Sequence, residues 1–316
     1  MKRHNMILIG ILVVQVILSA VVFWPSSAAD DQSEPLFPDL ESDAIVAVTI
    51  TNDAGESIAL AKVVGDWVLP EADDYPADET KIEPLLTKIL ELATGRLITR
   101  NETSHRQLQV AADSFMRLIE FETDQGEEFT VYLGSSPSYG ATHFRLDGQN
   151  EAYLTNSITI WDAGATASSW IDTTYLGIPQ ADVISLTLEN SHGTFSFRRD
   201  DEGNWTMDGL AADESLVETR VTSAVRQAST VNMLEPLGLE ELDSYGMDEP
   251  SAVATFETAD AEYTLYVGAQ NPDDETYVVI SSESDYYVRV SNHSVSPLVE
   301  NTREDLIEQP SETTSE

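Results

Sequence analysis

The sequence contains no cysteine. Disulfides, thiolate metal sites, cysteine nucleophiles and a lipid-modified N-terminal cysteine are therefore all excluded. Lysine is scarce, since Lys2, Lys62, Lys81 and Lys88 are its only occurrences. Lys+Arg amounts to 16 against 56 for Asp+Glu, a formal net charge of −40. Such a surface repels nucleic acid and anionic lipid headgroups, so neither is expected as a partner.

The acidic surface has two interpretations. A chain rich in carboxylates and poor in lysine tolerates a salt-rich solvent, because salt screens the self-repulsion of the surface. The same surface attracts cations and basic proteins, so dedicated cation binding is the second interpretation. The composition favours adaptation to a marine or halophilic habitat. The length of 316 residues and a hydrophobic content of 41% allow about two domains, each with its own core.

The one long apolar run is at the N-terminus, where residues 6–24 read MILIGILVVQVILSAVVFW. As a helix this run reaches about 28 Å, close to the thickness of a bilayer core, so it predicts a transmembrane anchor. Lys2 and Arg3 precede it, which places residues 1–5 in the cytoplasm. The expected location is the cytoplasmic (inner) membrane, single-pass, with the bulk of the chain extracytoplasmic or periplasmic. A cleaved signal peptide ending near Ala28 and Ala29 is the alternative.

Residues 25–41 are acidic and contain Pro25, Pro35 and Pro38, which predicts a solvated linker. At the other end, residues 309–316 are predicted to be a disordered tail.

An internal repeat organises the rest of the chain. Residues 46–69 align without a gap with residues 184–207, so that Trp67 falls on Trp205 at an offset of 138 residues. Further matches follow in the same order, including Phe121 with Phe256 and Gly134 with Gly268. The repeat predicts two similar units, residues 42–174 and residues 175–308.

Each unit combines strand patterns with one helix pattern. Alternating apolar residues and Gly-containing turns predict antiparallel hairpins. Thr80 and Ser215 each begin a capping-box pattern that is followed by an apolar stripe at helical spacing. Residues 96–109 are expected to be irregular, and residues 158–170 to form a closing helix. The predicted fold class is α+β, with antiparallel strands and one main amphipathic helix in each unit.

Three elements carry a resemblance to a bacterial family. They are the Gly65-Asp66-Trp67 and Gly203-Asn204-Trp205 turns, the run from Tyr245 to Pro250, and the joint Tyr175-Leu176-Gly177-Ile178. Together they resemble family 4340 of the domains of unknown function, over about residues 42–308. The first unit departs from the pattern, because residues 110–115 lack the Tyr-Gly and Pro elements.

That resemblance implies a single-pass membrane protein that accompanies auxiliary subunits of gliding-motility-type ABC transporters. The family supplies no catalytic residues to carry over.

The sequence contains no recognisable catalytic or metal-binding motif. His4, His105, His143, His192 and His293 do not show metal-ligand spacing, and no nucleophile elbow is present. The acidic turns at residues 200–204 and 271–275 carry oxygen ligands of the kind calcium needs, but not with EF-hand spacing. We therefore predict no catalytic, cofactor-binding or metal-ligating residue and no cofactor.

The expected function is that of a non-enzymatic, membrane-anchored accessory or interaction protein, with transporter subunits among its expected partners. Two alternatives remain open at this stage. One is an extracytoplasmic hydrolase of cell-wall or polysaccharide material that uses paired carboxylates. The other is a calcium-dependent surface binding module.

Overall fold

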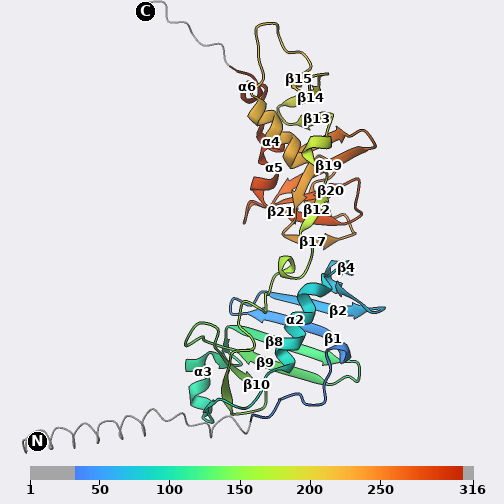
Figure 1. Ribbon diagram of the computed structural model, residues 1–316. Helices are drawn as coiled ribbons and strands as arrows, with labels where there is room; N and C mark the ends of the chain where they lie inside the picture. Colours follow the sequence, from blue (N-terminus) through green and yellow to red (C-terminus); the bar gives the residue numbers. More distant parts are fainter. Residues whose placement is uncertain (1–32, 309–316) are drawn as a thin grey trace, which may run out of the picture.

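The structure is a computed structural model, and it describes residues 33–308. Two antiparallel sheets, one in each half of the chain, dominate it (Figure 1). In spatial order the first sheet consists of β4 (Tyr75–Pro76), β3 (Asp66–Leu69), β2 (Ser57–Val63), β1 (Ile45–Asn52), β8 (Arg117–Thr123), β9 (Glu128–Leu133), β10 (Thr142–Leu146), β11 (Ala152–Thr155) and β5 (Leu97–Thr99).

The second sheet repeats this order. It consists of β15 (Trp205–Met207), β14 (Gly193–Arg199), β13 (Ser185–Asn190), β18 (Ala252–Glu257), β19 (Glu262–Gln270), β20 (Tyr277–Ser281), β21 (Tyr287–Val290) and β17 (Glu235–Gly238). Place by place these strands correspond to β3 through β5 of the first sheet, and β4 alone has no counterpart. Two small sheets pair β12 (Thr174–Gly177) with β16 (Thr230–Asn232), and β6 (Val110–Ala111) with β7 (Ser114–Phe115).

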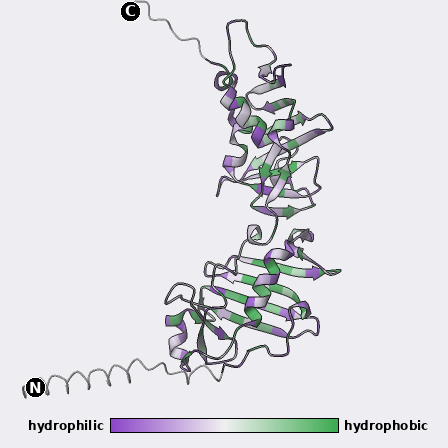
Figure 2. Cartoon of the chain, viewed as in Figure 1, coloured by the Kyte–Doolittle hydropathy of each residue, from purple (hydrophilic) through white to green (hydrophobic). Residues whose placement is uncertain are grey.

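Two helices of twelve residues cover the sheets. α2 (Glu79–Leu90) lies across the first sheet, and α4 (Glu218–Ser229) lies on the second, beside α5 (Asn292–Glu300) (Figure 1). The shorter helical segments are α3 (His105–Leu108), α6 (Arg303–Leu306), η1 (Ser42–Ala44), η2 (Pro70–Ala72), η3 (Glu102–Ser104), η4 (Ala167–Ser169), η5 (Gln180–Asp182) and η6 (Asp243–Tyr245). Figure 2 shows hydrophobic and hydrophilic residues mixed along the strands and helices of both halves.

The predicted α+β class is wrong. The described chain is mainly antiparallel β-sheet, and its helices are short. The apolar stripes that predicted one main amphipathic helix in each unit belong to α2 and α4, which have only twelve residues each. Long-range pairing between strands, which no local pattern displays, sets the class instead.

The membrane predictions also need correction. No helix within residues 33–308 is long and apolar enough to cross a bilayer. The anchor predicted at residues 6–24 lies outside the described residues, as do the predicted cytoplasmic residues 1–5 and the predicted tail at residues 309–316. This finding contradicts the prediction of a single-pass protein of the cytoplasmic membrane.

The linker predicted for residues 25–41 is wrong over its described part, residues 33–41. The backbone N–H of Leu36 donates to the carbonyl of Leu92 at 2.9 Å, and Pro35 forms a bridge with Ala93. Phe37 is 6% exposed and meets Phe121 edge-on, with ring centroids 5.5 Å apart. The proline and acidic content suggested a spacer, but a single aromatic side chain anchors this segment in the first core.

Three local predictions also differ from the structure. Residues 158–170 contain only the short η4 and no helix of the predicted length. Residues 96–109, expected to be irregular, contain β5, η3 and α3. The caps are displaced, since Asp78 rather than Thr80 caps α2, and Ser215 donates to Glu308 instead of capping α4. The cap of α2 is still a local one, whereas Ser215 and β5 pair with residues from elsewhere in the chain.

Candidate functional site

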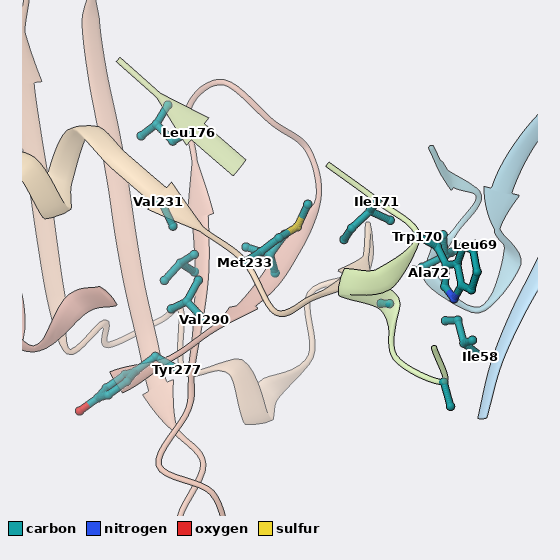
Figure 3. Close-up of a cluster of buried hydrophobic side chains, with 14 of the residues drawn as sticks. Ile58, Leu69, Ala72, Trp170, Ile171, Leu176, Val231, Met233, Tyr277 and Val290 are labelled. Atoms are coloured by element: carbon teal, nitrogen blue, oxygen red, sulfur yellow. The ribbon is translucent and has the colours of Figure 1, made fainter. Parts of the chain in front are cut away.

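The two units join through a continuous hydrophobic core. Trp170 is 3% exposed and its carbonyl accepts the N–H of Asp78 at 2.7 Å, which holds the joint against the first unit. Three residues further on, the carbonyl of Thr173 accepts the N–H of Met233 in the second unit at 2.9 Å. Figure 3 shows Trp170 and Ile171 on one side of this joint and Met233 on the other. The buried cluster that they belong to extends through both units.

Asp73 connects the units across the surface of this joint. It has a left-handed backbone (φ 52°), and its carboxylate oxygen Oδ2 accepts the backbone N–H of Leu239 at 2.7 Å. The carboxylate also lies against Gly238, which has φ +101°. An ideal Cβ at position 238 would fall 2.5 Å from Oδ2 of Asp73. Glycine is needed at this position because the carboxylate occupies the space of a side chain.

Tyr286 contacts Asp73, and two further tyrosines support Tyr286. Tyr286 donates its hydroxyl to the carbonyl of Asp73 at 3.1 Å, and its ring meets Tyr75 edge-on at 4.9 Å. Tyr175 donates to the carbonyl of Tyr286 at 2.8 Å and accepts the N–H of Ser281 at 3.0 Å. Burial raises the pKa of Tyr175 and of Tyr75, so both stay neutral near neutral pH. Together with Asp73 they hold the second unit against the first.

Replacing Asp73 by alanine should loosen this contact. The change leaves the N–H of Leu239 without its acceptor, and we expect a loss of about 1 kcal/mol in the free energy of unfolding. Because the chain has no cysteine, spin labels on cysteines introduced at Thr87 of α2 and Thr222 of α4 report the distance between the units. That distance distribution should broaden.

Asp74→Ala is the matched control for this prediction. Asp74 carries the same charge and the same left-handed backbone (φ 58°), and no hydrogen bond of its side chain is found within residues 33–308. Equal distance distributions in the two variants would contradict the role given to Asp73.

An open cleft of about 560 Å³ lies beside this contact, between the two units. The first unit contributes β2, η2 and η4, and the second contributes β17 and the turn before β20. Four acidic residues line the cleft: Glu56, Glu71, Glu235 and Asp274. Nothing in the sequence indicated a cleft here, because its walls combine separate segments that range from Glu56 to Arg289.

One cation lines the cleft, and it is already paired. Arg289 donates through Nε to Glu235 at 2.7 Å and through Nη1 to the hydroxyl of Thr276 at 3.2 Å. Hydrogen bonds from Thr276 lower the pKa of Asp274, which therefore stays charged. Arg289 neutralises Glu235, and the lining holds no second cation for Glu56, Glu71 and Asp274. The cleft therefore presents negative charge around its rim.

Part of the wall of the cleft is apolar. Ile58 and Leu69 are buried beneath it, and Leu234, at 42% exposed, faces solvent at its edge. An acidic rim around an apolar wall is complementary to a segment that carries both a basic group and an aliphatic side chain. Lysine and arginine side chains have this character, since a charged end follows an apolar stem.

The two acidic turns noted in the sequence lie apart from each other in the fold. Asp200 accepts the N–H groups of Glu202 and Asn204, each at 2.9 Å, so its carboxylate closes its own hairpin turn. The hydrogen bond from Asn204 is the main cause of its lowered pKa. The second turn supplies Asp274 to the inter-unit cleft. Within residues 33–308 no group of three or more His, Asp or Glu side chains is placed to hold a metal ion.

Two histidines make side-chain hydrogen-bond contacts, while His192 and His293 take part through their backbone, and His4 lies outside the described residues. His105 Nε2 lies 2.9 Å from the carbonyl of Asn150. His143 Nδ1 lies 3.2 Å from the hydroxyl of Ser135, but that hydroxyl also donates to the carbonyl of Leu108 at 3.1 Å. A glycosidase acid needs a raised pKa. Every carboxyl pKa shift found in the described residues is downward, so the hydrolase alternative gains no support.

The Tyr-Gly element has a structural counterpart that the sequence did not reveal. Gly246 (φ +68°) ends η6, and the carbonyl of Tyr245 approaches Gly268 so closely that a Cβ there would lie 2.0 Å from it. In the first unit Gln109 (φ 57°) ends α3, and the carbonyl of Leu108 approaches Gly134 in the same way. The match between Gly134 and Gly268 was visible in the sequence. The match between Leu108-Gln109 and Tyr245-Gly246 was not, because the first unit has Gln109 where the second has a glycine.

The comparison with family models matches residues 67–240 to the Domain of unknown function (DUF4340). The chain belongs to this family. The match covers more than half of the sequence and includes α2, the joint between the units and α4. The predicted family membership is thus confirmed. No curated protein and no solved structure matches the chain.

Proposed function

We propose that this protein is a non-enzymatic interaction protein and that a basic segment of its partner binds in the inter-unit cleft. The observation that carries the proposal is the cleft itself, which both units build beside the Asp73 contact. Its acidic rim selects for a basic ligand, and its apolar wall gives that ligand an area to bury.

The net charge of −40 supports the same choice of partner. A field of this sign accelerates the approach of basic proteins and repels acidic ones. The finer proposal, that the partner is a subunit of an ABC-type transport system of the gliding-motility type, rests on the family resemblance alone.

Affinity purification of the full chain from its native cells, followed by mass spectrometry, tests the proposal. We expect one or a few proteins to be recovered with the wild type. The double variant Glu56→Gln/Glu71→Gln removes two rim charges and should lower their recovery about tenfold, which corresponds to about 1.4 kcal/mol of binding free energy.

The matched control is Glu83→Gln/Glu91→Gln, which makes the same change in net charge on exposed positions of α2 and its cap. Recovery should equal that of the wild type. If the two double variants lower recovery equally, general charge attracts the partner and the cleft is not its site. If the wild type recovers no protein, the interaction function itself is wrong. Recovered partners without a transporter subunit among them would contradict only the finer proposal.

A further inference from the structure

The second sheet lacks one strand that the first sheet has. In the first unit β4 pairs with the outer side of β3, and just beyond β4 the N–H of Ala77 donates to the carbonyl of Trp67 at 2.9 Å. The counterpart of β3 in the second unit is β15, which is the last strand of its sheet. Within residues 33–308 no strand pairs with the outer edge of β15.

The backbone of Trp205 faces this open edge. The carbonyl of Asn204 accepts the N–H of Asp200 at 2.9 Å, and the N–H of Asp208 donates to the carbonyl of Ser196 at 3.0 Å. Asn204 and Asp208 therefore turn their backbone groups toward the β14 side. In an antiparallel ladder the residues between them alternate, so Trp205 turns its N–H and C=O outward. Within residues 33–308 no partner for these outward groups is found.

The C-terminal segment explains why this strand is missing. Ala77 lies two residues before the start of α2, and Leu216 holds the same place before α4. Leu216 forms an antiparallel bridge with Ile307, and the carbonyl of Ser215 accepts the N–H of Glu308 at 2.8 Å. The segment that would cover β15, by analogy with the first unit, is thus paired with the end of the described chain.

The described chain ends close to the open edge. Arg303 of α6 donates through Nη2 to the carbonyl of Gly209 at 3.1 Å, and Gly209 comes two residues after the end of β15. Figure 1 shows α6 and β15 at the same end of the second unit. Eight residues follow Glu308, and in an extended conformation they span about 26 Å. This length is enough to turn back and run along the three residues of β15.

The composition of residues 309–316, QPSETTSE, suits an edge strand. Thr313 and Thr314 are β-branched, which favours extended pairing. The segment carries carboxylates, among them Glu312, and β14 offers a cation to them. Arg198 on β14 is exposed and forms no ion pair within residues 33–308. Opposite charges on neighbouring strands stabilise their pairing.

We propose that residues 309–316 add to β15 as the ninth strand of the second sheet. This strand is the counterpart of β4. It runs antiparallel to β15 and bonds to the outward N–H and C=O of Trp205. An uncovered edge strand is a template for pairing with another chain. Residues 309–316 therefore keep the protein from associating through β15.

Amide hydrogen exchange followed by NMR, on the full chain and on a variant that ends after Glu308, tests this proposal. The N–H of Trp205 should exchange at least about tenfold faster in the shortened chain. The N–H of Trp67, which lies in the first unit, should exchange equally in both and so reports an intact fold. Thr313→Pro/Thr314→Pro removes two N–H groups but keeps length and charge, and it should behave as the shortened chain does.

Gln309→Pro is the matched control, because it adds a proline beside Pro310, ahead of the threonines that pair. Exchange at Trp205 should then equal that of the wild type. Equal exchange at Trp205 in the full and shortened chains, or equal effects of Gln309→Pro and the double proline variant, would overturn the proposal. Protection of Trp205 that persists in the shortened chain and rises with protein concentration would show that a second copy covers the edge instead.

Discussion

Replacing Phe37 by alanine is expected to lower the free energy of unfolding of the first unit by about 3–5 kcal/mol. Phe37 is 6% exposed and packs edge-on against Phe121 and Phe129, with ring centroids 5.5 and 5.3 Å away. The change removes a full aromatic ring from the core and leaves a cavity between two others. Urea unfolding followed by circular dichroism measures the loss.

The control for this prediction is Trp161→Ala, which truncates an aromatic residue that is 85% exposed. We expect it to change the unfolding free energy by no more than about 0.5 kcal/mol. If Phe37→Ala has an effect as small as the control, the segment before β1 does not belong to the folded unit. The expected large effect would establish that the first unit begins before residue 42.

Replacing Gly268 by alanine is the second change with a large expected effect. The new Cβ would lie 2.0 Å from the backbone carbonyl oxygen of Tyr245, and a backbone atom cannot move aside as a flexible side chain can. We expect a loss of about 3 kcal/mol in the unfolding free energy of the second unit. Gly134→Ala should have a similar effect on the first unit, because its Cβ would lie 2.2 Å from the carbonyl of Leu108.

Gly177→Ala serves as the control for both glycines. The nearest atom to its Cβ is a methyl group of Thr174 at 3.2 Å, which can shift, and its φ is not in the left-handed region. The control should stay close to the wild type when unfolding is followed by urea titration. If Gly268→Ala is as stable as Gly177→Ala, the backbone at Tyr245 can move away from residue 268, and the close contact does not constrain the fold.

The inter-unit cleft illustrates what a local sequence pattern cannot contain. Asp73 and Leu239 are 166 positions apart, and nothing around either residue indicates the other. Gly238 has φ +101°, which favours glycine by itself, but the carboxylate of Asp73 that lies where its side chain would be is visible only in the fold.

Local periodicity determined the elements that need no distant partner. The apolar stripe in residues 82–89 forms the buried face of α2, and the turn chemistry around Gly65 and Gly203 joins strands of similar hairpins in both units. The family membership also follows from the sequence, because its residues match the family's pattern directly.

The tertiary structure alone decided the rest. It made the fold mainly antiparallel β, since strand pairing joins distant residues, and it gave Phe37 a core to fill. In β1 a bulge between Ile45 and Ala47 buries Ile45 instead of Val46, which an unbroken alternation would have placed inside. Alternation and helical spacing are properties of neighbouring residues. Registers, joints and pockets are properties of residues brought together by folding, and they become visible only in the folded chain.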